Sequence, residues 1–269
     1  MLSCPAPHRA WVPALGNTVV LMMIPHPVNQ TADRQLFDRH LFRAVAVAFP
    51  LIVLAGFGRT YYVRGLFDVP PLPSMWVHAH GALMTGWVVL FATQVWFISS
   101  KRIRLHQRLG YAGIGLASLI VVVGFVTAVR TARYGGASPP PPNVSPLEFL
   151  AVPLFDLLMF VSLFGGAIYY RRRPAAHKRL MLLTAVNFLP PALARIPIMT
   201  LQALGPLWFF GLPAALTLLC LGLDARHTGH VNRVFLIGSV LLVSSYAGRL
   251  ALMTTGPWVS FAGWLVSFV

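Results

Sequence analysis

Two histidines in matching surroundings are the strongest candidates for chemistry in this sequence. His106 and His177 each lie at the start of a long apolar run, and each is followed two residues later by an arginine, Arg108 or Arg179. Imidazoles from two facing helices are the ligands that bis-histidine haem b requires, and arginines beside them can pair with the propionates. The pattern predicts that His106 and His177 hold haem b or another redox cofactor, with Arg108 and Arg179 next to it.

A structural role is the alternative for these histidines. His40 and His230 also precede apolar runs and are followed by an arginine within three residues. A layer of basic side chains at the lipid headgroups would produce this layout in any helical membrane protein. Such a position is close to water, which counts against a low-dielectric haem site. From the residues alone both interpretations stay open.

A second candidate site combines His78, His80 and Asp156. The two histidines lie near the outer end of one apolar run, and Asp156 is a carboxylate inside another. Side chains two residues apart on a helix point about 200° apart, so both histidines cannot hold one ion from a regular turn. An intramembrane carboxylate is costly, and its default interpretation is a functional site. Asp156 with one histidine therefore predicts a polar pocket for a metal ion, a quinone or a proton.

Three arginines are candidate partners for Asp156 in this pocket. Arg59, Arg195 and Arg249 each lie 18 or 19 residues after one of the histidines that begin a span. At 1.5 Å per residue, this spacing brings them close to the opposite headgroups. The alternatives are snorkelling at the interface and an ion pair that only holds helices together.

The elements that must position these residues are membrane helices. Only 10% of the 269 residues are charged and 57% are hydrophobic, whereas soluble domains carry about 25% charged residues. Unbroken apolar runs of about 20 residues favour membrane-crossing helices over a barrel. We predict an all-α polytopic bundle of about seven transmembrane helices, with the fifth interrupted by its prolines. Their approximate ranges are 41–62, 76–98, 109–129, 149–170, 179–199, 206–223 and 233–252.

The distribution of charge predicts the topology. The net charge of +15 by itself suggests a nucleic-acid-binding protein. When the basic residues are assigned to loops, however, most of them fall on one side of the predicted bundle. The positive-inside rule then predicts an inner-membrane protein with a cytoplasmic N-terminus and an external C-terminus. Nucleic-acid binding is not expected, and the lipid bilayer is the first partner.

The chain divides into three predicted parts. Residues 1–40 form a poorly ordered cytoplasmic tail, residues 41–252 the seven-helix bundle, and residues 253–269 an interfacial segment. The last part spaces its aromatic residues three to four apart, which suits a short helix lying at the membrane surface. Met22 or Met23 is an alternative start, in which case residues 1–21 are not in the native protein.

Three motifs resemble a group of uncharacterised bacterial multi-spanning inner-membrane proteins over about residues 40–269. They are His78-Ala79-His80-Gly81, Leu105-His106-Gln107-Arg108-Leu109-Gly110 and His177-Lys178-Arg179-Leu180-Met181. The group often has a Gly-x-Val-His stretch before its last helix, where this chain has Asn232 in place of the histidine. Histidines on successive helices are also loosely similar to haem b-binding membrane cytochromes. This similarity implies at most one haem, because the fourth span has no histidine opposite His78 or His80.

Three kinds of function follow from these observations. The first is haem b binding and electron transfer between the third and fifth spans. The second is a metal-dependent or proton-coupled membrane protein that uses Asp156 with His78 or His80. The third is a non-catalytic bundle that binds lipid or a partner membrane subunit, or forms a homo-oligomer. The residues predict no substrate and no reaction, and they do not decide whether the protein is an enzyme.

Overall fold

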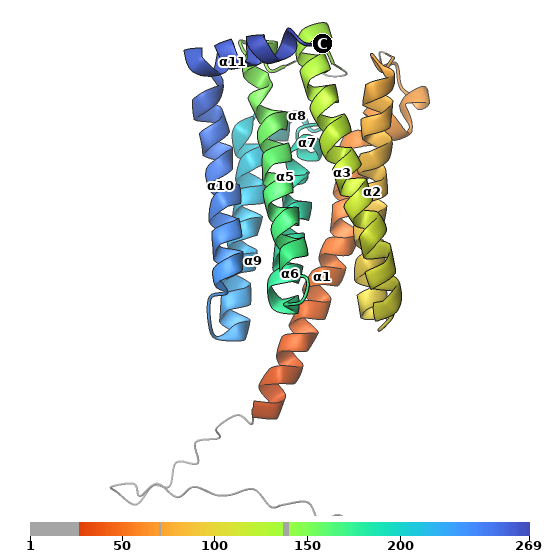
Figure 1. Cartoon of the computed structure of the whole chain (residues 1–269), viewed down its shortest axis with the longest axis vertical. Coiled ribbons are helices and arrows are strands. Elements are labelled where there is room, and N and C mark those ends of the chain that lie inside the picture. The colour runs from red at the N-terminus through yellow and green to blue at the C-terminus, as the bar shows by residue number, and fades with distance from the viewer. Residues whose placement is uncertain (1–26, 70, 137–139) are drawn as a thin grey trace, which may run out of the picture.

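The computed structural model describes residues 27–69, 71–136 and 140–269, which form an all-α bundle (Figure 1). The all-α class agrees with the prediction. Within the described residues, six helical segments are long and apolar enough to cross a membrane, compared with about seven predicted. These six segments are Arg39–Tyr62, Met75–Ser99, Ile103–Tyr134, Pro146–Tyr169, Leu207–Thr228 and Arg233–Met253.

The bundle is built from the following helices in chain order. They are α1 (Pro27–Phe57), η1 (Gly58–Tyr62), η2 (Arg64–Leu66), α2 (Met75–Ser99), α3 (Ile103–Tyr134), α4 (Pro146–Phe149), α5 (Ala151–Tyr169), α6 (Pro174–Asn187), α7 (Leu189–Leu193), α8 (Met199–Gln202), η3 (Leu207–Gly211), α9 (Leu212–Thr228), α10 (Arg233–Met253) and α11 (Gly256–Val266). Helix α1 begins at Pro27, so the helix starts inside the predicted tail of residues 1–40. The first part of α1 leaves the bundle (Figure 1). Residues 1–26, which hold the rest of that tail and the alternative start, lie outside the described residues.

The predicted fifth span is two short helices at the centre of the bundle. Helix α6 ends at Asn187, and α7 carries Pro190 and Pro191 in its first turn. Backbone N–H groups in the first turn of a helix have no intrahelical acceptor, so the N–H groups that proline lacks cost no hydrogen bond there. The predicted interruption is therefore confirmed. Most side chains from Arg179 to Leu193 are buried, and α6 packs against α5, α10, α9 and α1. Its fourteen residues are too few to count among the six long segments.

Aromatic packing and one close backbone contact join the outer helices to this centre. Trp87 of α2 is 1% exposed and packs edge-on against Phe160 of α5, with ring centroids 5.0 Å apart. Helix α1 meets α7 at Gly56, where an added Cβ would lie 2.1 Å from the Ala192 carbonyl oxygen. Only glycine allows that approach, because any other side chain would overlap the backbone of α7.

The C-terminal helix α11 lies across one end of the bundle, next to α3 and α4 (Figure 1). Trp258 is buried, and its indole Nε1 donates to the Leu147 carbonyl oxygen at 3.0 Å. The side chains of Phe261 and Trp264 are exposed on this helix, and that of Phe268 is exposed just after it. A short helix with this spacing was predicted, and its position at a membrane surface stays a prediction.

The basic connections gather at the other end of the bundle. The α2–α3, α5–α6 and α9–α10 loops all lie there (Figure 1). This arrangement agrees with the expectation that most basic residues fall on one side of the bundle. It also brings the starts of α3 and α6, and therefore His106 and His177, to the same end.

Candidate functional site

His106 and His177 come together from different helices. Each is the fourth residue of its helix, His106 in α3 and His177 in α6. Their ring centroids lie 6.3 Å apart with an angle of 79° between the ring planes. Both side chains are half-buried. The two histidines are 71 positions apart in the sequence, so their contact depends on how α3 and α6 approach around α5.

The hydrogen bonding of the two rings leaves imidazole nitrogens available. His177 Nδ1 lies 2.9 Å from the Ala167 carbonyl oxygen of α5. Because a carbonyl only accepts, this bond assigns the proton to Nδ1 and leaves the Nε2 lone pair free. A backbone carbonyl on the second ring nitrogen is the usual orienting contact of a metal-binding histidine. His106 Nδ1 is buried and has no hydrogen-bond partner within the described part of the chain.

Two imidazoles suit some ligands and not others. A structural zinc ion needs four protein ligands and a catalytic one usually three. The described residues contain no group of three or more His, Cys, Asp or Glu side chains that could hold a metal ion. A haem supplies its own four equatorial nitrogens and needs only axial ligands from the protein. The ring centroids of His106 and His177 lie 6.3 Å apart, so the two imidazoles are the protein groups that could hold such a cofactor.

The two arginines predicted beside this pair differ in their surroundings. Arg108 is exposed. Arg179 is buried and forms a two-pronged ion pair with Asp224 of α9, with Nε–Oδ2 at 2.9 Å and Nη2–Oδ1 at 2.7 Å. Its remaining nitrogen, Nη1, donates to the Ala175 carbonyl oxygen at 2.6 Å. All three nitrogens of Arg179 are thus engaged, whereas Arg108 is exposed.

Asp224 is a buried charged residue that the sequence pattern did not predict. The sixth span was predicted to end at residue 223, whereas α9 continues to Thr228. Gly229 follows with φ of +73°, a left-handed conformation that commonly ends a helix. That glycine is the signal from which the longer helix, and a buried Asp224, could have been inferred.

Asp156 lies in a second buried ion pair. Of its candidate partners, Arg249 is the one placed against it, with Nη1 bonded to Oδ1. Arg249 is fully buried and also donates to the backbone oxygen and the hydroxyl of Ser245. Its guanidinium lies 5.2 Å from the ring centroids of Phe210 and Tyr246. The pair joins α5 to α10 at the end of the bundle away from the basic loops.

Two polar atoms of this neighbourhood are buried without a hydrogen-bond partner in the described residues. Asn187 donates from Nδ2 to the backbone oxygen of Asp156 at 3.0 Å, while its Oδ1 is unpaired. The hydroxyl of Tyr246 is also unpaired, although the ring stacks on Phe210. Unpaired buried polar atoms cost free energy and are commonly satisfied by ordered water or a ligand. We call Asp156, Arg249, Ser245, Asn187 and Tyr246 the polar cluster.

The described residues hold no group of three or more His, Cys, Asp or Glu side chains that could bind a metal ion, so His78, His80 and Asp156 do not form a three-ligand set. That one of the two histidines acts with Asp156 stays a prediction. His78 packs against Tyr61, whose hydroxyl donates to the His78 backbone oxygen at 3.2 Å. His80 lies at the contact between α2 and α3, where a Cβ on Gly124 would be 3.6 Å from its ring. Its Nδ1 is buried without a partner in the described part of the chain.

The other two predicted arginines have separate contacts. Arg59 is exposed and lies over the ring of Phe67 at 4.9 Å. Arg195 donates from Nη1 to the Pro191 backbone oxygen at 2.8 Å and lies over the ring of Phe57 at 4.9 Å. Of the three arginines, Arg249 is the one in an ion pair with Asp156, whereas Arg59 and Arg195 lie over the rings of Phe67 and Phe57.

The fold and composition define the class of protein. The chain is an integral, multi-pass helical membrane protein with six candidate spans among its described residues. Comparisons with protein families, with curated proteins and with solved structures found no match. No family is identified by them, and the function must be inferred from the residues of this chain.

Proposed function

We propose that this membrane protein binds one haem b through His106 and His177 and transfers electrons. The observation that carries the proposal is the approach of these two half-buried imidazoles from α3 and α6, with ring centroids 6.3 Å apart. We further propose a bacterial inner membrane as its location, with the N-terminus in the cytoplasm, because the basic loops gather at one end of the bundle.

The surroundings of the two rings support ligation over a purely structural role. The Ala167 carbonyl holds His177 through Nδ1, so that Nε2 is the free electron-pair donor. His106 has a buried nitrogen whose hydrogen-bonding capacity the described protein does not use. Haem iron, when bound, supplies a one-electron couple. The protein residues orient the ligands, and exposed Arg108 provides a positive charge for a propionate.

An optical spectrum of the full-length protein in detergent, purified from haem-sufficient cells, tests the proposal. We expect a Soret band that shifts on reduction with dithionite. The variants His106→Ala and His177→Ala should each lose most of the band, while His230→Ala, a histidine at the same end of the bundle, should retain it. A colourless preparation would refute the proposal, as would a band that survives both ligand substitutions.

The polar cluster supports a second candidate function, in which protons or a small polar ligand reach Asp156. The specific observation is that Asn187 Oδ1 and Tyr246 hydroxyl are buried and unpaired beside the Asp156–Arg249 ion pair. In this proposal Asp156 acts with the polar cluster, without His78 or His80. Proton uptake by protein reconstituted in vesicles should be lost in Asp156→Asn and kept in Asp224→Asn. Equal uptake by both variants and the wild type would exclude it.

A further inference from the structure

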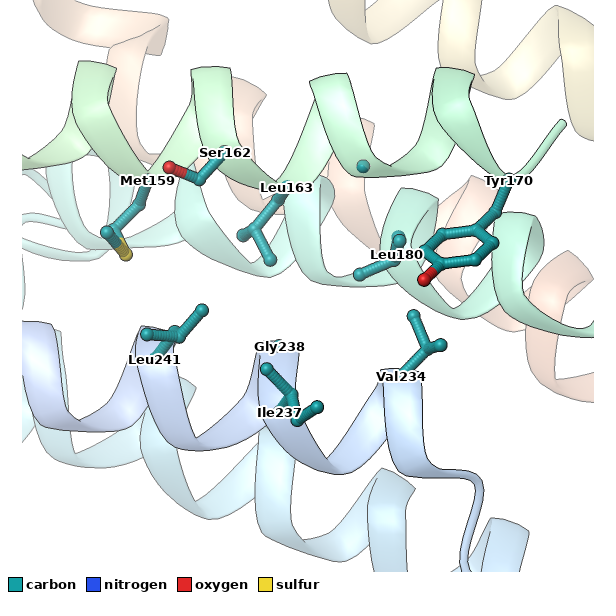
Figure 2. Close-up of a pocket in the computed structure, with 10 residues that line it drawn as sticks. Met159, Ser162, Leu163, Tyr170, Leu180, Val234, Ile237, Gly238 and Leu241 are labelled. Atoms are coloured by element: carbon teal, nitrogen blue, oxygen red, sulfur yellow. The ribbon is translucent and has the colours of Figure 1, made fainter.

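An apolar groove runs along the bundle between α5 and α10, with α6 as its floor. Figure 2 shows Met159 and Leu163 of α5 facing Ile237 and Leu241 of α10 across the gap, with Leu180 of α6 behind them. The cavity has a volume of about 170 Å³. Enclosed apolar cavities of roughly 150 Å³ stay free of water and take up hydrophobic molecules, and the walls of this open groove are of the same apolar kind. A hydrocarbon chain is therefore the kind of ligand that the walls of this groove favour.

Two glycines explain why the groove is open. Gly238 of α10 allows Leu183 to pack directly on the helix backbone, since an added Cβ would lie 2.7 Å from Leu183 Cδ1. Gly166 of α5 does the same for Leu180, at 3.2 Å. The leucines of α6 thus fill the space next to the glycines. Because neither glycine has a side chain, the groove is wider at these positions, and Leu163 of α5 reaches to within 3.4 Å of where a Cβ on Gly238 would lie.

The length of the groove matches one leaflet of a bilayer. On α5 it extends from Met159 to Tyr170, which is ~16 Å at 1.5 Å per residue. Half of a hydrocarbon core is ~15 Å thick. Both helices belong to candidate membrane-spanning segments, so the groove opens among lipid chains. One acyl chain is thus a fitting occupant in length as well as in chemistry.

The groove is mostly apolar along its length, with Ser162 as a polar residue in its lining, and it is polar at one end. Tyr170 closes that end, and its side chain points into the gap near Val234 (Figure 2). Arg171 and Arg172 follow Tyr170 directly, Arg233 precedes Val234, and all three arginines are exposed. These three arginines are thus neighbours in the chain of the residues at this end of the groove, and the next residue, Arg173, lies over the Tyr170 ring at 5.9 Å. An acyl chain in the groove would place its own headgroup beside them.

We propose that this groove, with Arg171, Arg172 and Arg233, is a binding site for one anionic phospholipid. An acyl chain lies along Leu163, Ile237 and Leu241, and the phosphate headgroup contacts the arginines. Basic residues at the end of an intramembrane groove are the typical recognition elements for acidic lipid headgroups. The site is separate from His106 and His177 and from the polar cluster, and it does not depend on the proposed haem.

Native mass spectrometry of the full-length protein with dioleoyl phosphatidylglycerol and dioleoyl phosphatidylcholine tests the headgroup contact. We expect the first lipid to be retained more strongly. Changing Arg171, Arg172 and Arg233 together to glutamine should remove the preference. Each charge that is removed should lower the retention of phosphatidylglycerol relative to phosphatidylcholine by about fivefold. The matched control changes Lys101, Arg102 and Arg104, exposed basic residues of the α2–α3 loop region, to glutamine and should keep it.

A second pair of variants tests the groove itself. Ile237→Trp fills the cavity and should lower retention of phosphatidylglycerol several-fold, whereas Val240→Trp, at an exposed position on α10 outside the groove, should not. Circular dichroism shows whether each variant is folded. Equal retention of the two lipids by the wild type would overturn the proposal. Equal retention of phosphatidylglycerol by Ile237→Trp and Val240→Trp would also overturn it. The same is true if the two sets of glutamine substitutions lose the lipid preference equally.

Discussion

Replacing Asp156 with leucine is the most informative perturbation of the bundle. Arg249 is 0% exposed and Asp156 is 7% exposed, so water does not screen the pair. Removing one partner of a buried ion pair costs about 3–5 kcal/mol, because the other charge is left without compensation. An arginine keeps its charge, whereas a carboxylate can accept a proton. We therefore expect Asp156→Leu to lower the free energy of unfolding by about 3–5 kcal/mol, and Arg249→Met to lower it by less.

The double variant distinguishes the interaction energy of the ion pair from the separate contributions of Asp156 and Arg249. Asp156→Leu with Arg249→Met removes both charges and fills the space with apolar side chains. Such replacements are often neutral or stabilising, so we expect the double variant to recover most of the loss. The resulting coupling energy should exceed about 2 kcal/mol, which is within the range found for residues in direct contact.

Reversible unfolding in mixed micelles, followed by tryptophan fluorescence, measures these free energies. Asp224→Leu is the matched control, since it breaks the other buried pair, with Arg179, at the opposite end of the bundle. It should give a loss of similar size that Arg249→Met does not rescue. The reasoning is refuted if Asp156→Leu costs less than about 1 kcal/mol, the value of an exposed pair. A double variant as unstable as Asp156→Leu would refute it equally.

Three further predictions concern packing and capping. Gly56→Ala should destabilise the protein by more than about 3 kcal/mol because its Cβ would overlap the backbone of α7, whereas Gly58→Ala, with nothing within 4 Å, should be nearly neutral; thermal unfolding compares them. Asn232→Ala removes the side chain that accepts from the Phe235 amide at 3.1 Å at the start of α10. It should cost about 0.5–2 kcal/mol in the same assay, and an unchanged midpoint would contradict this. Trp258→Phe loses the bond to the Leu147 carbonyl oxygen and should speed proteolysis of α11, while Trp264→Phe, at an exposed position, should not.

Local features of the chain predicted the long helices well. A run of about 20 apolar residues can satisfy its backbone in lipid only as a helix, whatever surrounds it. The interruption near Pro190 was equally local, since proline removes a backbone donor wherever it occurs. The matching contexts of His106 and His177 also pointed to neighbouring positions, and the structure places their rings 6.3 Å apart. Their role as haem ligands stays a prediction.

Contacts between distant helices could not be predicted in the same way. Arg59, Arg195 and Arg249 were equivalent candidates in the sequence, because each lay at a similar distance beyond a histidine. Only the packing of α5 against α10 places Arg249, rather than the other two, against Asp156. The ion pair of Arg179 with Asp224 likewise depends on the approach of α6 to α9.

The sequence by itself determined that the protein is a helical membrane protein, where its long helices run, and which loops are basic. These properties depend on composition and spacing within single segments. The tertiary structure decided that the broken helix α6–α7 lies at the centre, that Arg179 is paired with Asp224, and that a groove opens between α5 and α10. These features require side chains and glycines from separate helices to meet in three dimensions, and the pattern within any one helix carries no information about its neighbours.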